Sequence, residues 1–144
     1  MKRLARRLGD GDEGQVLVMV ALMMVGLVGV VGLVTDGGLV FSQRRDLQNV
    51  ADAAAAAGAM QIDEAAYRAD GVVVLDEAMA KQAAALYLDG EGVTYSVSVS
   101  PNRVDVEVSR QATTGFLRVL GIDSVTVNAS GSALPVHGVA VAAP

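Results

Sequence analysis

The sequence predicts an α+β fold: a long N-terminal transmembrane helix that continues as an Ala-rich stalk, followed by a small head with short helices and a three-stranded, mainly antiparallel sheet. Three observations lead to this prediction. Residues 16–34 form an unbroken run of nineteen apolar or glycine residues. Residues 51–59 are all alanine except for one aspartate and one glycine. Later segments alternate apolar with polar side chains, as half-buried strands do.

The apolar run is long enough to cross a membrane. At about 1.5 Å per residue it approaches the roughly 30 Å thickness of the hydrocarbon layer. No charged residue interrupts it. A cleavable secretory peptide has a similar pattern, but its apolar core is shorter and ends at a small-residue cleavage site, which "GLVTDGG" does not offer. We therefore expect a membrane anchor.

Basic residues predict the orientation of this anchor. Only Arg44 and Arg45 occur in the fifteen residues after the run. Because basic flanks remain in the cytoplasm, we expect a single-pass protein of the cytoplasmic (inner) membrane. Its N-terminus would lie in the cytoplasm and its C-terminal head outside it. Membrane lipid would surround the transmembrane helix. Four basic residues precede the run: Lys2, Arg3, Arg6 and Arg7.

Small and apolar residues then mark a contact surface along the helix. Glycine recurs at every third position near the end of the run, which in lipid allows another helix to approach closely, although glycine is also common in membrane helices for other reasons. Beyond the run, a seam of three- and four-residue steps continues through Leu33, Val40 and Gln43 into the alanines, which favour helix and close packing. The expected helix-packing residues are Gly26, Gly29, Gly32, Asp36, Leu47, Val50, Ala54 and Ala57.

The head is expected to begin with two short helices. Asp63 and Glu64 favour the start of the first, which should end at Gly71. The second is expected over about 74–88, because acidic residues precede an apolar pattern and a glycine follows it. Its predicted apolar face consists of Leu75, Met79 and Leu86.

Strands follow these helices. Residues 93–99 and 104–108 alternate valine or tyrosine with polar residues around Pro101 and Asn102, which predicts a hairpin. A third strand should start at Val125. Before it, residues 116–120 predict an apolar helical turn, and we expect the ring of its Phe116 to be buried between the sheet and the helices.

Several of these features, taken in order, resemble a known family. Gly14 precedes the apolar helix, Asp36 and Gly38 follow it, and an arginine, a Leu-Gln pair and an alanine run come next. This order resembles the N-terminal region of TadE/TadG-like proteins of the tight-adherence (Flp, type IVb) pilus assembly systems. The matching later positions are Arg44 or Arg45, Leu47, Gln48 and 51–55.

The resemblance implies a candidate leader cleavage site between Gly14 and Gln15. Prepilin-like members usually carry a glutamate five residues after that glycine, which neutralises the new N-terminal amine in a neighbouring subunit. Met19 stands there in this chain. An unpaired ammonium in low dielectric is costly, so we expect the leader to be retained. The alternative is a cleaved subunit at a position such as a fibre tip, where no such pairing is required.

Composition disfavours enzymatic and nucleic-acid-binding functions. The chain has no cysteine and a single histidine, His137, so the usual nucleophilic triads and metal-ligand sets lack their parts. The formal net charge is −5, which disfavours a phosphate-binding surface. We expect no catalytic or metal-binding residues, no cofactor, no small-molecule substrate and no nucleic acid partner.

These observations predict four segments. They are a cytoplasmic basic leader (1–14), a transmembrane helix and stalk (15–60), an extracytoplasmic α+β head (61–135) and a tail (136–144). The expected function is that of a membrane-anchored pilus-assembly or minor pilin-like protein that acts by contact with pilin-like and pilus-assembly proteins. The alternative is a single-pass anchored extracytoplasmic binding module unrelated to pili.

Overall fold

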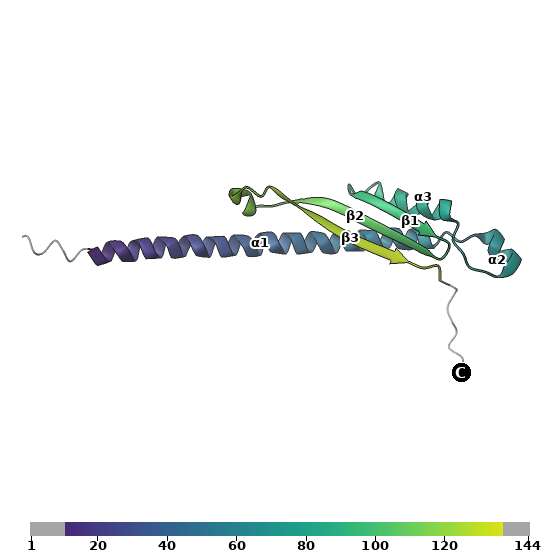
Figure 1. The fold of residues 1–144 in the computed structure, drawn as a ribbon, viewed down its shortest axis with the longest axis horizontal. Coiled ribbons are helices and arrows are strands. Elements are labelled where there is room, and N and C mark those ends of the chain that lie inside the picture. The colour runs from purple at the N-terminus through teal and green to yellow at the C-terminus, as the bar shows by residue number, and fades with distance from the viewer. Residues whose placement is uncertain (1–10, 137–144) are drawn as a thin grey trace, which may run out of the picture. The chain divides into compact units, whose positions relative to one another are not determined.

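The structure is a computed structural model that describes residues 11–136, and its elements confirm the predicted α+β class. Most of the basic leader lies outside the described residues, as do His137 and the rest of the tail. Figure 1 shows the elements along the chain. They are α1 (Gly11–Ala59), α2 (Glu64–Asp70), α3 (Glu77–Leu88), β1 (Thr94–Ser100), β2 (Arg103–Thr113), the 3-10 helix η1 (Leu117–Leu120) and β3 (Ser124–Ala133).

The chain forms two compact units. The first unit contains α1 up to Gly38 together with the segment Thr114–Asp123, which connects β2 to β3. The second unit contains the chain from Leu39 to Thr113 and from Ser124 onward, and so includes the sheet, α2, α3 and the last part of α1. This division differs from the four predicted segments, whose functional boundaries stay a prediction.

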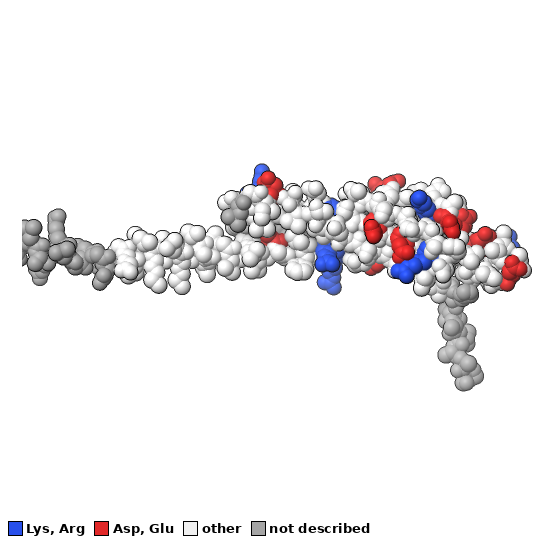
Figure 2. Space-filling model, viewed as in Figure 1, with Lys and Arg blue, Asp and Glu red and all other residues white. Residues whose placement is uncertain are grey.

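In the first unit, α1 exposes the large side chains of its apolar run. Every large apolar side chain from Val16 to Val34 is exposed. On the face shown in Figure 2, this stretch carries no Lys, Arg, Asp or Glu. Among the described residues, α1 is the one helix long and apolar enough to cross a membrane. Since water disfavours such a surface, the helix fits a membrane-anchored protein.

The second unit is built on an antiparallel sheet with strand order β1-β2-β3. The hairpin predicted at Pro101 and Asn102 is confirmed, because β1 ends at Ser100 and pairs there with Arg103 of β2. Side chains alternate between the faces of the sheet, so that valines point to one face and mostly hydroxyl or charged residues to the other. Two consecutive pairings set the register: Val97 with Val106, and Val106 with Gly131.

Small side chains bring α1 and α3 close to the valine face of this sheet. A Cβ at Gly58 of α1 would lie 3.0 Å from the Ala80 carbonyl oxygen of α3 and 3.2 Å from Val104 of β2. A Cβ at Gly131 of β3 would overlap the backbone of Ala51 in α1. The three elements therefore meet in one tightly packed core. Its buried members include Leu47, Ala51, Ala54, Ala55, Ala80, Ala84, Leu88, Val104, Val106, Val108 and Val127.

The predicted apolar face of the second head helix is wrong. Met79 is 50% exposed and Leu86 is 70% exposed, whereas Ala80 and Ala84 of α3 are buried. Leu75 is buried, but it precedes α3 and pairs with Ile62 in an isolated bridge. The buried side of α3 consists of Ala80 and Ala84, whose small side chains let the helix approach the sheet closely, together with Leu88 at its C-terminal end.

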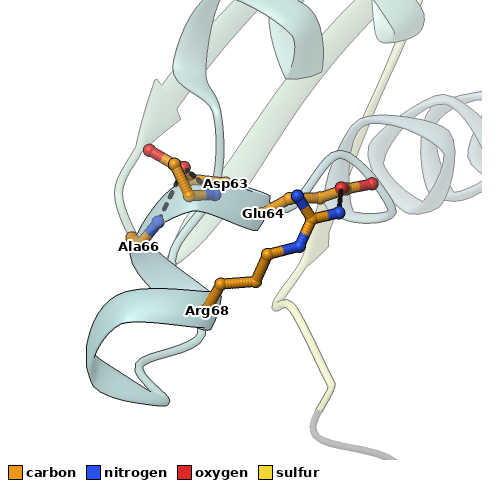
Figure 3. Close-up of polar contacts among 5 residues, drawn as sticks. Asp63, Glu64, Ala66 and Arg68 are labelled. Carbon is orange, nitrogen blue, oxygen red and sulfur yellow. Dashed lines mark hydrogen bonds and ion pairs between the residues drawn. The ribbon is translucent and has the colours of Figure 1, made fainter.

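Local hydrogen bonds and a glycine explain where α2 begins and ends. The predicted helix start at Asp63 is confirmed: its carboxylate accepts hydrogen bonds from the backbone N–H groups of Ala65 and Ala66 at 2.9 and 3.0 Å (Figure 3). Figure 3 also shows the exposed Glu64–Arg68 ion pair one turn apart, which contributes little to stability. Gly71 ends the helix at φ +67°, where glycine is favoured.

Candidate interaction site on helix α1

Asp36 is a buried carboxylate in the first unit, two residues beyond the end of the apolar run. Its side chain is only 1% exposed. Oδ1 accepts a hydrogen bond from the Gly115 backbone N–H at 3.0 Å, and Oδ2 accepts one from the Leu117 N–H at 2.7 Å. Because both oxygens are used, this one side chain attaches a segment about 80 residues away to α1.

The attached segment, Thr114–Asp123, is closed by its own hydrogen bonds, and we call it the clasp loop. The Thr114 N–H donates to the Asp123 carbonyl at 3.2 Å, and the Thr114 hydroxyl donates to the Ile122 carbonyl. Between these ends the chain makes the single 3-10 turn η1, followed by Gly121 at φ +86°. The loop therefore presents the Gly115 and Leu117 N–H groups in a preformed arrangement that suits one carboxylate.

Electrostatics favour the ionised form of Asp36. The hydrogen bond from Leu117 lowers the pKa of the Asp36 carboxyl below its ordinary value, burial acts in the opposite direction, and the backbone N–H groups of Phe116 and Gly115 lower it further. Asp36 is thus a charged side chain whose partners come from its own chain. A partner protein could reach this carboxylate only by displacing the clasp loop.

Gly32 is the second contact point of the clasp loop, one helical turn before Asp36. A Cβ at Gly32 would lie 2.5 Å from the ring of Phe116, so only glycine leaves room for it. The expectation that Phe116 belongs to the core between sheet and helices is wrong, since the ring is 46% exposed and rests on α1 in the first unit. Its hydrophobicity was clear from the sequence, but its packing partner was not.

Comparison with known proteins shows a family similarity for part of the chain. The family model Tad, described as "Putative Flp pilus-assembly TadE/G-like", matches residues 14–61. Residues 14–61 are thus similar to this family, and we call them the TadE/G-like segment. The resemblance predicted from the ordered motifs is thereby confirmed over about a third of the chain. No curated protein and no solved structure matches the chain.

Within the TadE/G-like segment, the predicted glycine strip divides into two parts. A Cβ at Gly26 or Gly29 would meet no atom within 4 Å, so this part of α1 is open. Gly32 and Asp36, by contrast, are covered by the clasp loop. Packing of Gly26 and Gly29 against another protein stays a prediction, and the structure leaves the space for it.

The alanine seam of the TadE/G-like segment packs within its own chain. Leu47 and Ala54 are 0% exposed in the core of the second unit. Val50 packs against this core, and Ala57 is half-buried. The sequence pattern predicts contacts with other proteins along this seam, but it does not show that the chain's own sheet packs against these residues. A partner helix would contact the exposed faces of α1 instead.

The candidate cleavage site lies at the start of the family match. Gly14 and Gln15 are exposed residues within α1, and Met19 is exposed one turn later. Cleavage between Gly14 and Gln15 stays a prediction. Sequence reasoning also missed Gly115, Leu117 and Gly131, which become informative only through their contacts with Asp36 and Ala51. The closely spaced Gly115 and Gly121 were the available signal for a specific loop.

Proposed function

We propose that this chain is a membrane-anchored assembly component or minor pilin-like subunit of a Flp/Tad-type pilus or a related secretion system. The family match over residues 14–61, together with the exposed apolar helix, supports a pilus-assembly role. The match carries the proposal, because an apolar helix alone would equally suit any anchored protein. The same family assignment favours a structural protein over an enzyme.

The proposed mechanism is contact between helices in the membrane. The open strip at Gly26 and Gly29 would accept a helix from a pilin-like or pilus-assembly protein, since small residues permit the close backbone approach on which helix association in lipid depends. The exposed remainder of the run faces lipid. The core of the second unit is already filled by its own alanines, so this unit offers its exposed surface to partners.

Co-purification tests this mechanism. The tagged chain is crosslinked in native membranes, solubilised and recovered, and the captured proteins are identified by mass spectrometry. The wild type should capture pilin-like or pilus-assembly proteins, and Gly26→Leu combined with Gly29→Leu should lose them. Val25→Leu combined with Val28→Leu is the matched control and should retain them. If both variants capture the same proteins in equal amounts, the glycine strip is not an interface with them. Absence of such partners from the wild type would favour the anchored binding module.

Orientation has a separate test, because the chain contains no natural cysteine. We propose that the N-terminus is cytoplasmic and the second unit extracytoplasmic, on the basis of the basic residues before the run. Ser98→Cys, on an exposed position of β1, should react with a membrane-impermeant maleimide in intact spheroplasts. Lys2→Cys should react only after permeabilisation. The reverse pattern would contradict the orientation without affecting the family assignment.

A further inference from the structure

The clasp loop carries apolar side chains that its own unit leaves uncovered. Val119 is 85% exposed, and Phe116 and Ile122 are each 46% exposed. These three exposed apolar side chains lie within seven residues of a loop that is closed by its own hydrogen bonds. An arrangement of this kind in water is unfavourable, so a partner or an apolar solvent is expected to cover it.

The attachment points place this surface at a defined level along α1. Phe116 rests on Gly32, two residues before the apolar run ends at Val34, and the loop backbone is bound by Asp36, two residues after it. At about 1.5 Å per residue, these points lie roughly 3 Å inside and roughly 3 Å outside the end of the run. The clasp loop thus straddles the level at which the membrane-spanning helix leaves the hydrocarbon.

The polar groups of the loop suit the same level. Asp36 is shielded from lipid because two backbone N–H groups satisfy its carboxylate. Arg118 Nε lies 3.4 Å from Asp123 Oδ1, and both side chains are largely exposed. The loop therefore has charged groups beside its apolar ones, and these groups can lie among the lipid headgroups. Side chains with both characters are typical of segments that lie in a membrane interface.

We propose that the clasp loop is a membrane-interface element, with Phe116, Val119 and Ile122 inserted among the lipids that surround the outer end of α1. The occupant of this surface is therefore lipid, continuous with the lipid around the apolar run. The inference rests on the membrane anchor within the proposed function and not on the identity of any pilus partner. A protein partner covering the loop is the competing explanation, and purified chain in vesicles distinguishes the two.

Fluorescence quenching in vesicles tests the proposal, since the full-length chain has no natural tryptophan. The purified chain is reconstituted into phosphatidylcholine vesicles with brominated acyl chains. Val119→Trp should be quenched several-fold more strongly by the brominated lipid than Leu86→Trp, which replaces a 70% exposed leucine of α3. It should also be protected from iodide in the water, and its emission should lie at shorter wavelength.

A third variant separates failure of the proposal from failure of the anchor. Met24→Trp lies within the apolar run and should be strongly quenched by the brominated lipid. If it is quenched while Val119→Trp behaves like Leu86→Trp and is open to iodide, the loop is not in the interface and the proposal is wrong. If Met24→Trp is not quenched, the anchor itself fails and the inference fails with it. Because Val119 is exposed, its replacement is not expected to disturb the loop.

Discussion

Asp36 is the residue that most clearly joins a sequence motif to a structural role. In the family-like order of motifs it is the acidic residue after the apolar helix, and in the structure both of its carboxylate oxygens accept backbone hydrogen bonds from the clasp loop. An unpaired carboxylate at this position would be costly near lipid. Asp36 therefore stabilises the loop and hides its own charge at the same time.

Asp36→Asn should loosen the clasp loop. Asparagine has only one side-chain oxygen, and its NH2 group cannot accept the hydrogen bond that Leu117 donates at 2.7 Å. Hydrogen–deuterium exchange measured by mass spectrometry should become faster in peptides covering 114–123. Asp46→Asn, an exposed position on the same helix, is the control and should leave exchange unchanged. Equal exchange in the two variants would mean that the carboxylate does not hold the loop.

The same attachment should depend on pH. The pKa of Asp36 is lowered in the folded protein. The ionised carboxylate therefore stabilises the clasp loop fully above the ordinary aspartate pKa of about 3.9, and this stabilisation is lost as the pH falls through the lowered pKa. Acidification below about pH 4 should therefore increase exchange in the clasp loop of the wild type, and Asp36→Asn should lack this step. Asp123→Asn should keep the step, because its ion pair with Arg118 is exposed and weak.

At the scale of elements, close approach decides how α1 and the sheet pack in the second unit. The helix contributes mainly alanines, and Gly131 of β3 faces the backbone of Ala51. This arrangement removes apolar area from water with few large side chains, which agrees with an aromatic content of only 3%. A single added methyl group at the contact is therefore expected to matter.

Gly131→Ala should destabilise the second unit by about 1–3 kcal/mol, because the new Cβ would overlap the Ala51 backbone and force α1 and β3 apart. Urea unfolding followed by circular dichroism in detergent micelles measures the effect. Gly90→Ala makes the same chemical change where no atom lies within 4 Å and should shift stability by less than about 0.5 kcal/mol. Similar midpoints for the two variants would contradict the proposed close contact.

At the scale of the whole molecule, the remaining prediction concerns retention of the basic leader before the membrane helix. The residues before Gly11 lie outside the described structure, and Gly14 and Gln15 belong to α1. Met19 provides no carboxylate to neutralise a new amine at Gln15. Retention of the basic leader therefore agrees best with the electrostatics of a helix in lipid, where an unpaired charge is costly.

Intact-mass measurement of protein from its native membrane tests this prediction. The mass should correspond to a chain that still includes the leader, and Gly14→Val should show the same processing state. A native chain beginning at Gln15, with the full leader present only in Gly14→Val, would show that a peptidase removes the leader. The protein would then belong at a position in the fibre where the amine needs no acidic partner.

The sequence alone determined the features that depend on neighbouring residues. The apolar helix, the hairpin at Pro101 and Asn102, and the helix start at Asp63 follow from length, alternation and capping, which are local properties. The ordered motifs likewise indicated the family, because they require no knowledge of contacts.

Only the tertiary structure decided which surfaces these elements bury. Asp36 accepts hydrogen bonds from Gly115 and Leu117, which lie 79 and 81 positions later in the sequence. Gly131 contacts Ala51 across a similar separation. The alanine seam suited a partner helix and the chain's own sheet equally well by pattern. In the structure, the sheet packs against the alanine seam and excludes water from it. A periodic pattern shows that a face of a helix will be buried, but it does not show which element will cover that face.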